Sequence, residues 1–156
     1  MNTATTRLAT LALIALIAAG CTGNVREVVG KAPLVGIDGV QRSDSEIALE
    51  IALRNVNDRP LTLSGIAVEL SLDERGPVRI RQDLSLSIAP RGREVITLSL
   101  PAERAPWEAL ESLSDGQHNR LPWQMSLQLF RPGESPMSAE TEGWLHPVPG
   151  QRDRFR

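Results

Sequence analysis

The sequence predicts an all-β fold, an antiparallel β-sandwich with one short helix. From residue 45 onward, apolar and polar side chains alternate with a period of two. This is the pattern of strands that have one buried face and one solvated face. Clusters rich in Pro, Gly, Asn and Asp interrupt the alternation at intervals typical of a sandwich. A helix would scatter the same apolar residues around its axis.

Each expected strand has its own run of alternating residues. The first, from Pro33 to Val40, is weaker because Gly36 and Gly39 interrupt it. The clearer runs follow at residues 47–53, 66–72, 78–80, 84–88, 96–100 and 123–129. We expect a last strand, from about Ala139 to His146, to pair with the strand at 121–130. The turn clusters between the runs lie at residues 57–60, 73–77, 89–92 and 131–133.

One segment, Ala105 to Leu113, breaks the alternation and predicts a short helix. Pro106 suits the first turn of such a helix. Its large apolar residues share one face at helical spacing: Trp107, Leu110 and Leu113. We expect this face to cap one open end of the sandwich.

The N-terminal residues have the layout of a secretory signal. Arg7 supplies the positive region, Leu8 to Ala19 the apolar region, and small residues lead to Cys21, the only cysteine. The apolar run to Gly20 is 13 residues long, whereas a membrane-spanning helix needs roughly 20. The sequence therefore predicts a cleaved signal over residues 1–20. No second cysteine is available to form a disulfide with Cys21.

This layout resembles a bacterial lipoprotein signal, whose processing leaves a diacylglyceryl-modified cysteine at the new N-terminus. A plain secretory signal with an incidental cysteine is the alternative. The resemblance implies a mature chain of 136 residues anchored to a membrane through Cys21. In such lipoproteins, Asp after the cysteine favours inner-membrane retention, and here that residue is Thr22. The expected location is thus the outer membrane, facing the periplasm.

The mature chain divides into three expected parts. Residues 21–30 would be a tether that reaches roughly 30 Å at most, so the domain would stay close to the bilayer. Residues 31–150 would form the β-sandwich, long enough for a core of its own. Residues 151–156 are predicted to be a disordered tail.

The mature chain is mildly acidic, with 16 basic and 19 acidic side chains. This balance predicts no nucleic-acid partner. Aromatic side chains for stacking bases or sugars are also scarce, with no Tyr, two Phe and three Trp. The expected partners are the membrane, through the anchor, and either an envelope protein or a lipid.

The sequence predicts neither an enzyme nor a cofactor or metal site. Cys21 would be lipidated, and His118 and His146 are the only histidines, the residue type that can act as an acid or base near neutral pH. The chain has no Gly-x-Ser-x-Gly nucleophile elbow and no glycine-rich phosphate loop. Its His and Cys residues do not fall at metal-ligand spacing.

The stretch from Asn55 to Leu61 ends one expected strand and begins the next. It contains an Asn-x-Asn turn, Asn55-Val56-Asn57, then Pro60-Leu61, and Gly65-Ile66 follows downstream. With the segments 33–37 and 88–100, this order of motifs resembles the late embryogenesis abundant (LEA) type 2 family. That family is also described as the water stress and hypersensitive response domain. The resemblance covers roughly residues 31–100.

The resemblance implies an immunoglobulin-like or fibronectin type III-like sandwich with no established active site. It also implies an association with desiccation and stress tolerance, and bacterial members of the family are often lipoproteins. Asn side chains tolerate left-handed backbone and bond their own main chain. We therefore interpret Asn55, Asn57 and Pro60 as turn residues with a structural role.

Three roles remain open at this point. The first is a non-catalytic envelope domain that protects or scaffolds under water stress. The second is a module that binds lipid or another apolar ligand, with Trp107, Leu110 and Leu113 at its mouth. The third is an assembly factor for an outer-membrane complex, acting through an exposed strand edge.

Overall fold

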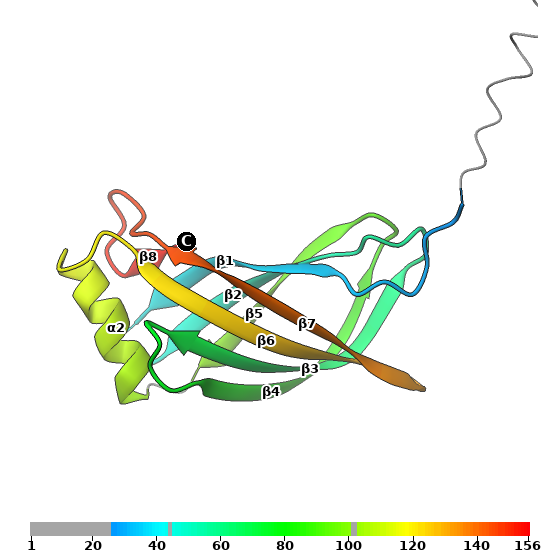
Figure 1. Ribbon diagram of the computed structural model, residues 1–156, viewed down its shortest axis with the longest axis horizontal. Helices are drawn as coiled ribbons and strands as arrows, with labels where there is room; N and C mark the ends of the chain where they lie inside the picture. The colour runs from blue at the N-terminus through cyan, green and yellow to red at the C-terminus, as the bar shows by residue number, and fades with distance from the viewer. Residues whose placement is uncertain (1–25, 44, 101–102) are drawn as a thin grey trace, which may run out of the picture.

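The computed structural model describes residues 26–43, 45–100 and 103–156. The predicted signal over residues 1–20 and Cys21 lie outside these ranges. The described residues form two antiparallel four-stranded sheets that face each other, with one helix at one end (Figure 1). The predicted all-β sandwich is therefore confirmed.

Each sheet combines strands from distant parts of the sequence. The order in one sheet is β5-β2-β1-β8, from β5 (Arg93–Leu100), β2 (Ile47–Arg54), β1 (Leu34–Arg42) and β8 (Arg154–Phe155). The order in the other is β4-β3-β6-β7, from β4 (Val78–Ile88), β3 (Leu61–Leu72), β6 (Leu121–Arg131) and β7 (Glu134–Leu145). Figure 1 looks onto the second sheet, with the first behind it.

The core lies between the sheets and consists of the inward rows of alternating residues. In β2 these inward residues are 0% exposed, namely Ile47, Leu49, Ile51 and Leu53. The facing rows of β3 and β6 are also buried, including Leu70, Met125 and Leu127. Burial of such side chains contributes about 25 cal/mol for each Å² of apolar surface removed from water. The alternation seen in the sequence is thus the pattern that builds the core.

Two strands are longer than their sequence pattern predicts. β3 extends back to Leu61, and the runs 78–80 and 84–88 join into the single strand β4. The β3–β4 register shifts between Leu63 and Gly65. This irregularity lets Leu63 and Ile66 both face the core, although they are an odd number of residues apart. A strict period-two pattern therefore breaks at this point even though the strand continues.

Helix α2 (Arg104–Ser114) covers one end of the sandwich, as the sequence predicts (Figure 1). Its buried side chains include Ala109, Leu110 and Leu113, each at most 1% exposed. Gly116 follows the helix with φ 71° and donates its N–H to the Leu113 carbonyl at 3.2 Å. Glycine takes this left-handed conformation at little cost, so it ends the helix here.

The predicted pairing of the last long strand is confirmed, since β7 pairs antiparallel with β6 from Leu121 to Arg131. β7 begins at Glu134, five residues before the expected start. The reason is a tight turn at Pro132 and Gly133, with φ 69° at Gly133. This turn brings the chain directly back into hydrogen-bonded pairing with β6.

The prediction of a disordered tail over residues 151–156 is wrong. Residues 154–155 form β8, which pairs with β1 through Val40 and Gln41. The Phe155 side chain is 1% exposed, and the backbones of His146 and Arg156 exchange hydrogen bonds of 2.8 and 3.0 Å. Burial of one large aromatic side chain and this pairing offset the entropy of ordering a short segment.

Candidate functional site

The sandwich has two ends of different chemistry. We call one the Asn-turn end, made of residues 26–33, 54–60, 89–94 and 131–134. We call the other the helix end, made of α2, β8 and the β3–β4 connection. In Figure 1 the Asn-turn end lies at the right, where residue 26 is found, and the helix end lies at the left.

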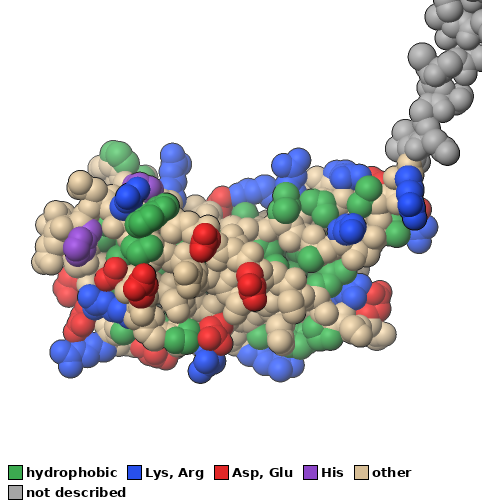
Figure 2. Space-filling model, in the orientation of Figure 1, with side chains coloured by type: hydrophobic (Ala, Val, Ile, Leu, Met, Phe, Trp, Pro, Cys, Tyr) green, Lys and Arg blue, Asp and Glu red, His purple; other side chains and the backbone are tan. Residues whose placement is uncertain are grey.

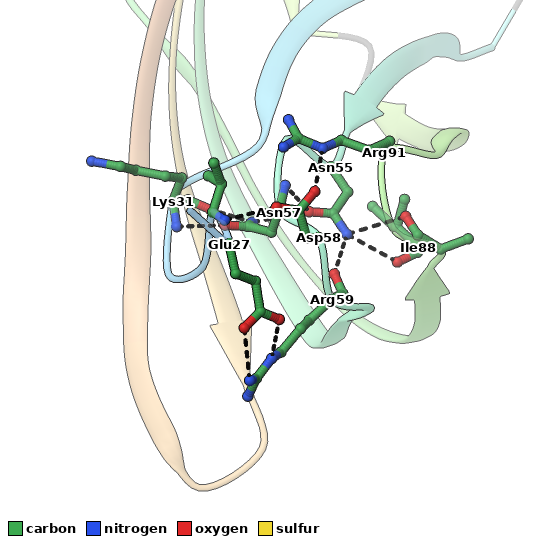
Figure 3. A network of polar contacts seen from close by, with 10 residues as sticks. Glu27, Lys31, Asn55, Asn57, Asp58, Arg59, Ile88 and Arg91 are labelled. Carbon is green, nitrogen blue, oxygen red and sulfur yellow. Dashed lines mark hydrogen bonds and ion pairs between the residues drawn. The ribbon is translucent and has the colours of Figure 1, made fainter. Parts of the chain in front are cut away.

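Asn55 and Asn57 are the buried polar residues of the described ranges, at 0% and 5% exposure. The Asn55 side-chain amide donates to the carbonyls of Arg59, Ala89 and Ile88 at 2.8, 3.1 and 3.2 Å (Figure 3). Its Oδ1 accepts from the backbone N–H and from the side-chain amide of Asn57, each at 2.9 Å. One side chain therefore joins the end of β2 to the start of β3 and the end of β4.

Asn57 continues this network to the N-terminal segment. Its Nδ2 donates to the Lys31 carbonyl at 2.8 Å, and its Oδ1 accepts the Lys31 N–H at 2.8 Å. The Asn57 amide thereby forms with the Lys31 backbone the two hydrogen bonds that a neighbouring strand would form. Because both groups of the Asn57 amide are used, no smaller side chain reproduces the pair.

Asp58 and Arg59 add further contacts to the same segment. The Val28 N–H donates to Asp58 Oδ2 at 2.7 Å, and the Asp58 N–H donates to the Val28 carbonyl at 2.8 Å. Arg59 forms a two-point ion pair with Glu27 at 2.7 and 3.0 Å. The described part of the expected tether, from residue 26, thus lies against the turn rather than extending from it (Figure 3).

The charges in this cluster are stabilised in their ionised forms. The Val28 N–H and then the Arg91 guanidinium, 2.8 Å from Oδ1, lower the pKa of the Asp58 carboxyl. The hydrogen bond from Arg59 lowers the pKa of Glu27. Both carboxylates are therefore negative at neutral pH and balance nearby guanidinium groups.

Pro60, the third predicted turn residue, is exposed. It lines a shallow groove of about 450 Å³ at the Asn-turn end, together with Val29, Thr62 and Met137. The N-terminal segment forms one wall of this groove. Pro60 thus ends the turn at the surface, whereas Asn55 and Asn57 lie beneath it.

The residues predicted to line a ligand mouth are found at the opposite end. Leu110 and Leu113 are 0% and 1% exposed and pack as core residues. Trp107 is half-buried, with the Arg42 guanidinium 5.1 Å from the centre of a ring. Helix α2 therefore closes this end of the core. Leu110 and Leu113 pack inward, and Trp107 packs against the Arg42 guanidinium.

A second groove, of about 540 Å³, crosses the outer face of the β4-β3-β6-β7 sheet. Its lining mixes charged groups with small side chains, including Glu69, Arg79, Ser126 and Glu140. Arg79 donates twice to the Glu69 carboxylate, at 2.9 and 3.2 Å. Figure 2 shows this face as mostly tan, the colour of the backbone and of uncharged polar side chains, with scattered acidic and hydrophobic side chains. An open groove lined in part by ionised side chains is poorly suited to enclose an apolar ligand.

His118 and His146 are both exposed, His118 after α2 and His146 after β7. In the part of the chain that the structure describes, no three His, Cys, Asp or Glu residues gather as a metal-binding group. The same residues include no helix long and apolar enough to cross a membrane. The site that the described residues assemble most completely is therefore the amide network at the Asn-turn end.

No family model matches this sequence. No curated protein matches it either.

Solved structures do resemble the chain at low identity. A crystal structure of a protein from Archaeoglobus fulgidus is 13% identical with TM-score 0.45, covering 76% of this chain and 98% of that one. The solution structure of AT1g01470 from Arabidopsis thaliana is 14% identical with TM-score 0.42, covering 81% and 92%. A candidate late embryogenesis abundant (LEA) protein, At2g46140.1, is 13% identical with TM-score 0.44, covering 96% and 87%. At these values we infer neither family membership nor function from the likeness.

Proposed function

We propose that this chain is a non-catalytic lipoprotein of the outer membrane that faces the periplasm. Its LEA type 2-like sandwich would protect or scaffold the envelope during water stress. The observation that carries the proposal is the signal layout that ends at Cys21, the only cysteine of the sequence. A thiol at this position is the group that a lipoprotein signal presents for acylation.

The family part of the proposal rests on the order of motifs around Asn55 and on what those motifs do. The Asn55 amide bonds three carbonyls from two connections, so the motif has a demanding structural task. A side chain committed to the backbone in this way is not available for a substrate. Its role is to hold the domain together, which agrees with a protective or scaffolding function.

The packing of the helix end favours this role over that of an apolar-ligand carrier. Leu110 and Leu113 are buried within the core rather than arranged around an opening. A carrier would need these side chains to separate before a lipid could enter between the sheets. The interior is instead filled by the protein's own side chains.

A chromosomal deletion complemented by variants tests the proposal. Cells with the wild-type gene should retain the protein in the outer-membrane fraction and survive drying better than the deletion strain. Cys21→Ala should yield a folded protein that leaves the membrane fraction and restores less survival. Retention of Cys21→Ala in that fraction would contradict the anchor, and equal survival of all strains would contradict the protective role.

The edge strand β7 favours a second candidate function, assembly with an envelope protein. β7 spans 12 residues and lies at the edge of its sheet, with β6 as its neighbour. Such an edge accepts a partner strand through backbone hydrogen bonds. Its exposed acidic residues, Glu140 and Glu142, would select the partner's charge. Cross-linking in whole cells from a photoreactive residue at Ser138 would identify a partner on this edge.

A further inference from the structure

We infer that the domain stands end-on at the membrane, with its Asn-turn end against anionic phospholipid head groups and its helix end directed away. This inference rests on the proposed lipidation of Cys21. It adds an interaction surface and an orientation that the anchor alone does not define. Three observations lead to it: where the N-terminal segment is held, how short the remaining link is, and how charge is distributed.

The N-terminal segment is fixed to the Asn-turn end by contacts on three of its residues. Val28 exchanges two hydrogen bonds with Asp58, and Lys31 exchanges two with the Asn57 amide. Glu27 pairs with Arg59 at the surface. Two of these attachments use backbone groups of the segment, so they do not depend on flexible side chains of the segment itself. The chain therefore enters the domain at this end.

The link between the attachment and the anchor is short. Only residues 22–25 separate Cys21 from Arg26 in the sequence. Five residue steps reach at most roughly 18 Å, and the seven steps to Val28, the first residue held through its backbone, reach at most roughly 25 Å. The long strands of the sandwich, such as the 11-residue β6, extend over roughly 35 Å. Since the link is shorter than the strands, the Asn-turn end must stay near the bilayer, whereas the helix end can lie farther from it.

The Asn-turn end is also the basic part of the domain. It contains seven basic and four acidic side chains, whereas the remaining described residues contain nine basic and fourteen acidic ones. The basic side chains are Arg26, Lys31, Arg54, Arg59, Arg91, Arg93 and Arg131. Figure 2 shows Lys and Arg side chains gathered at the end where residue 26 lies.

Not all of these cations are neutralised within the protein. Arg59, Arg91 and Arg131 pair with carboxylates of the same end, and Arg93 pairs with Asp38. The other three, Arg26, Lys31 and Arg54, are exposed, and within the described ranges no carboxylate lies within 4.0 Å of them. Exposed Lys and Arg next to a lipid anchor are attracted by the negative potential of anionic head groups. The short link lets these side chains approach within the Debye length of about 10 Å over which that potential acts.

The C-terminal arginines do not belong to this surface. Arg154 lies in β8 at the helix end, where it donates to Glu50 at 3.0 Å. A membrane contact through the C-terminal residues would require the opposite orientation. The two orientations are therefore distinguishable by measuring which end is near the lipid.

The test uses the acylated full-length protein reconstituted into vesicles. Because acylation would occupy the Cys21 sulfur, an introduced cysteine is the only thiol that a fluorophore can label. Thr62→Cys places the probe at the Asn-turn end, and Gln117→Cys places it after α2 at the helix end; both positions are exposed. Quenching by spin-labelled lipid head groups is then compared for the two probes, with and without phosphatidylglycerol in the vesicles.

We expect the Thr62→Cys probe to be strongly quenched and the Gln117→Cys probe to remain bright. The difference should grow with phosphatidylglycerol and shrink at high salt. Replacement of Lys31 and Arg54 by Gln should reduce it, whereas the matched change Arg156→Gln at the helix end should not.

Equal quenching of both probes, or stronger quenching of Gln117→Cys, would overturn the orientation. If the quenching of the Thr62→Cys probe does not change with phosphatidylglycerol or with salt, the head-group contact is overturned. The mass of the protein, measured before reconstitution, separates these failures from that of the proposed function. A protein without acyl chains would remove the premise and overturn both proposals.

Discussion

The two ends of the sandwich are closed by different physical means. At the Asn-turn end, the buried amides of Asn55 and Asn57 bond carbonyls and N–H groups from several connections. At the helix end, Leu110, Leu113 and Phe155 exclude water with apolar surface. Hydrogen bonds are directional and fix the path of each connection, whereas apolar packing is non-directional and depends on volume. The hydrogen bonds of the Asn-turn end therefore fix the paths of its connecting segments, whereas the helix end contributes buried apolar surface.

The helix end has polar contacts of its own, but they join more distant parts of the chain. Arg42 of β1 donates to Asp153 at 2.6 Å across 111 positions of sequence. Asp153 also accepts from Ser114 of α2 at 2.8 Å. These contacts connect the first strand, the helix and the C-terminal strand. Substitutions at the two ends should therefore differ in size and in their dependence on pH.

The largest effect is expected for Phe155→Ala at the helix end. Removal of this fully buried ring should destabilise the protein by about 4 kcal/mol, because a cavity replaces it and β8 loses its buried contact with the core. Urea unfolding monitored by tryptophan fluorescence measures the change. Arg156→Ala, next to it but exposed, is the control and should change little. A loss below 1 kcal/mol for Phe155→Ala would indicate that β8 adds nothing to the core.

Asn55→Ala should produce the next largest effect, about 3 kcal/mol, because buried carbonyls and the Asn57 N–H lose their partner. Asn119→Ala, at an exposed position, is the matched control. Amide hydrogen exchange should increase in residues 26–31 of Asn55→Ala more than in α2. Uniform exchange in both regions would contradict a local role for the network.

Gly143→Ala tests how tightly β7 packs against the Trp123 ring of β6. A methyl group at Gly143 would lie 2.7 Å from the Trp123 ring, which is too close for a carbon–carbon contact. We expect a destabilisation of about 2 kcal/mol and a shift in the fluorescence of Trp123. Gly76→Ala, where no atom lies within 4 Å of the added carbon, should be close to neutral. Equal stability of the two variants would show that β7 can shift to accommodate the added methyl group at little cost in free energy.

Asp153→Asn should give a smaller effect that depends on pH. Burial raises the pKa of the Asp153 carboxyl, but hydrogen bonds from Ser114 and Arg42 outweigh it and lower the pKa below its usual 3.8. Since the folded pKa is lower than the unfolded one, the carboxylate stabilises the fold above about pH 4. That contribution is lost as the pH falls through the lowered pKa.

We therefore expect Asp153→Asn to cost about 1 kcal/mol at pH 7 and less below pH 3. Urea unfolding at both pH values measures the difference. A cost that is independent of pH would show that shape, rather than charge, matters at this position.

The smallest effect is expected for Arg79→Gln on the outer face of the second sheet. Arg79 and Glu69 are paired at 2.9 Å, but the arginine side chain is 72% exposed and water screens the attraction. Thermal unfolding should show no measurable change in Tm. A clear decrease would mean that the outer groove contributes to stability through this pair.

Local patterns in the sequence predict much of the fold. The alternation over 47–53 and 123–129 identifies β2 and β6 because each strand buries one face. The apolar spacing of Trp107, Leu110 and Leu113 identifies α2 for the same reason. Asn55 and Asn57 stand out as turn residues because their side chains bond nearby backbone. These features depend on residues within a few positions of one another.

The parts that the sequence does not predict depend on contacts between distant residues. β8 has two residues, too few for any periodicity, and its partner β1 lies more than 100 positions earlier. The attachment of Val28 and Lys31 to the Asn-turn is likewise invisible, because nothing within residues 26–31 encodes the position of Asn57. The bulge near Gly65 changes the phase of β3 where a strict alternation predicts a break. In each case tertiary contacts decide the outcome.

The most direct test of the central proposal, a lipid-anchored domain, is the mass of the N-terminal peptide of the membrane-extracted protein. We predict a peptide that begins at Cys21 and carries a diacylglyceryl group on its sulfur. A peptide that begins at another residue, or at Cys21 with an unmodified thiol, would contradict the anchor and the orientation inferred from it.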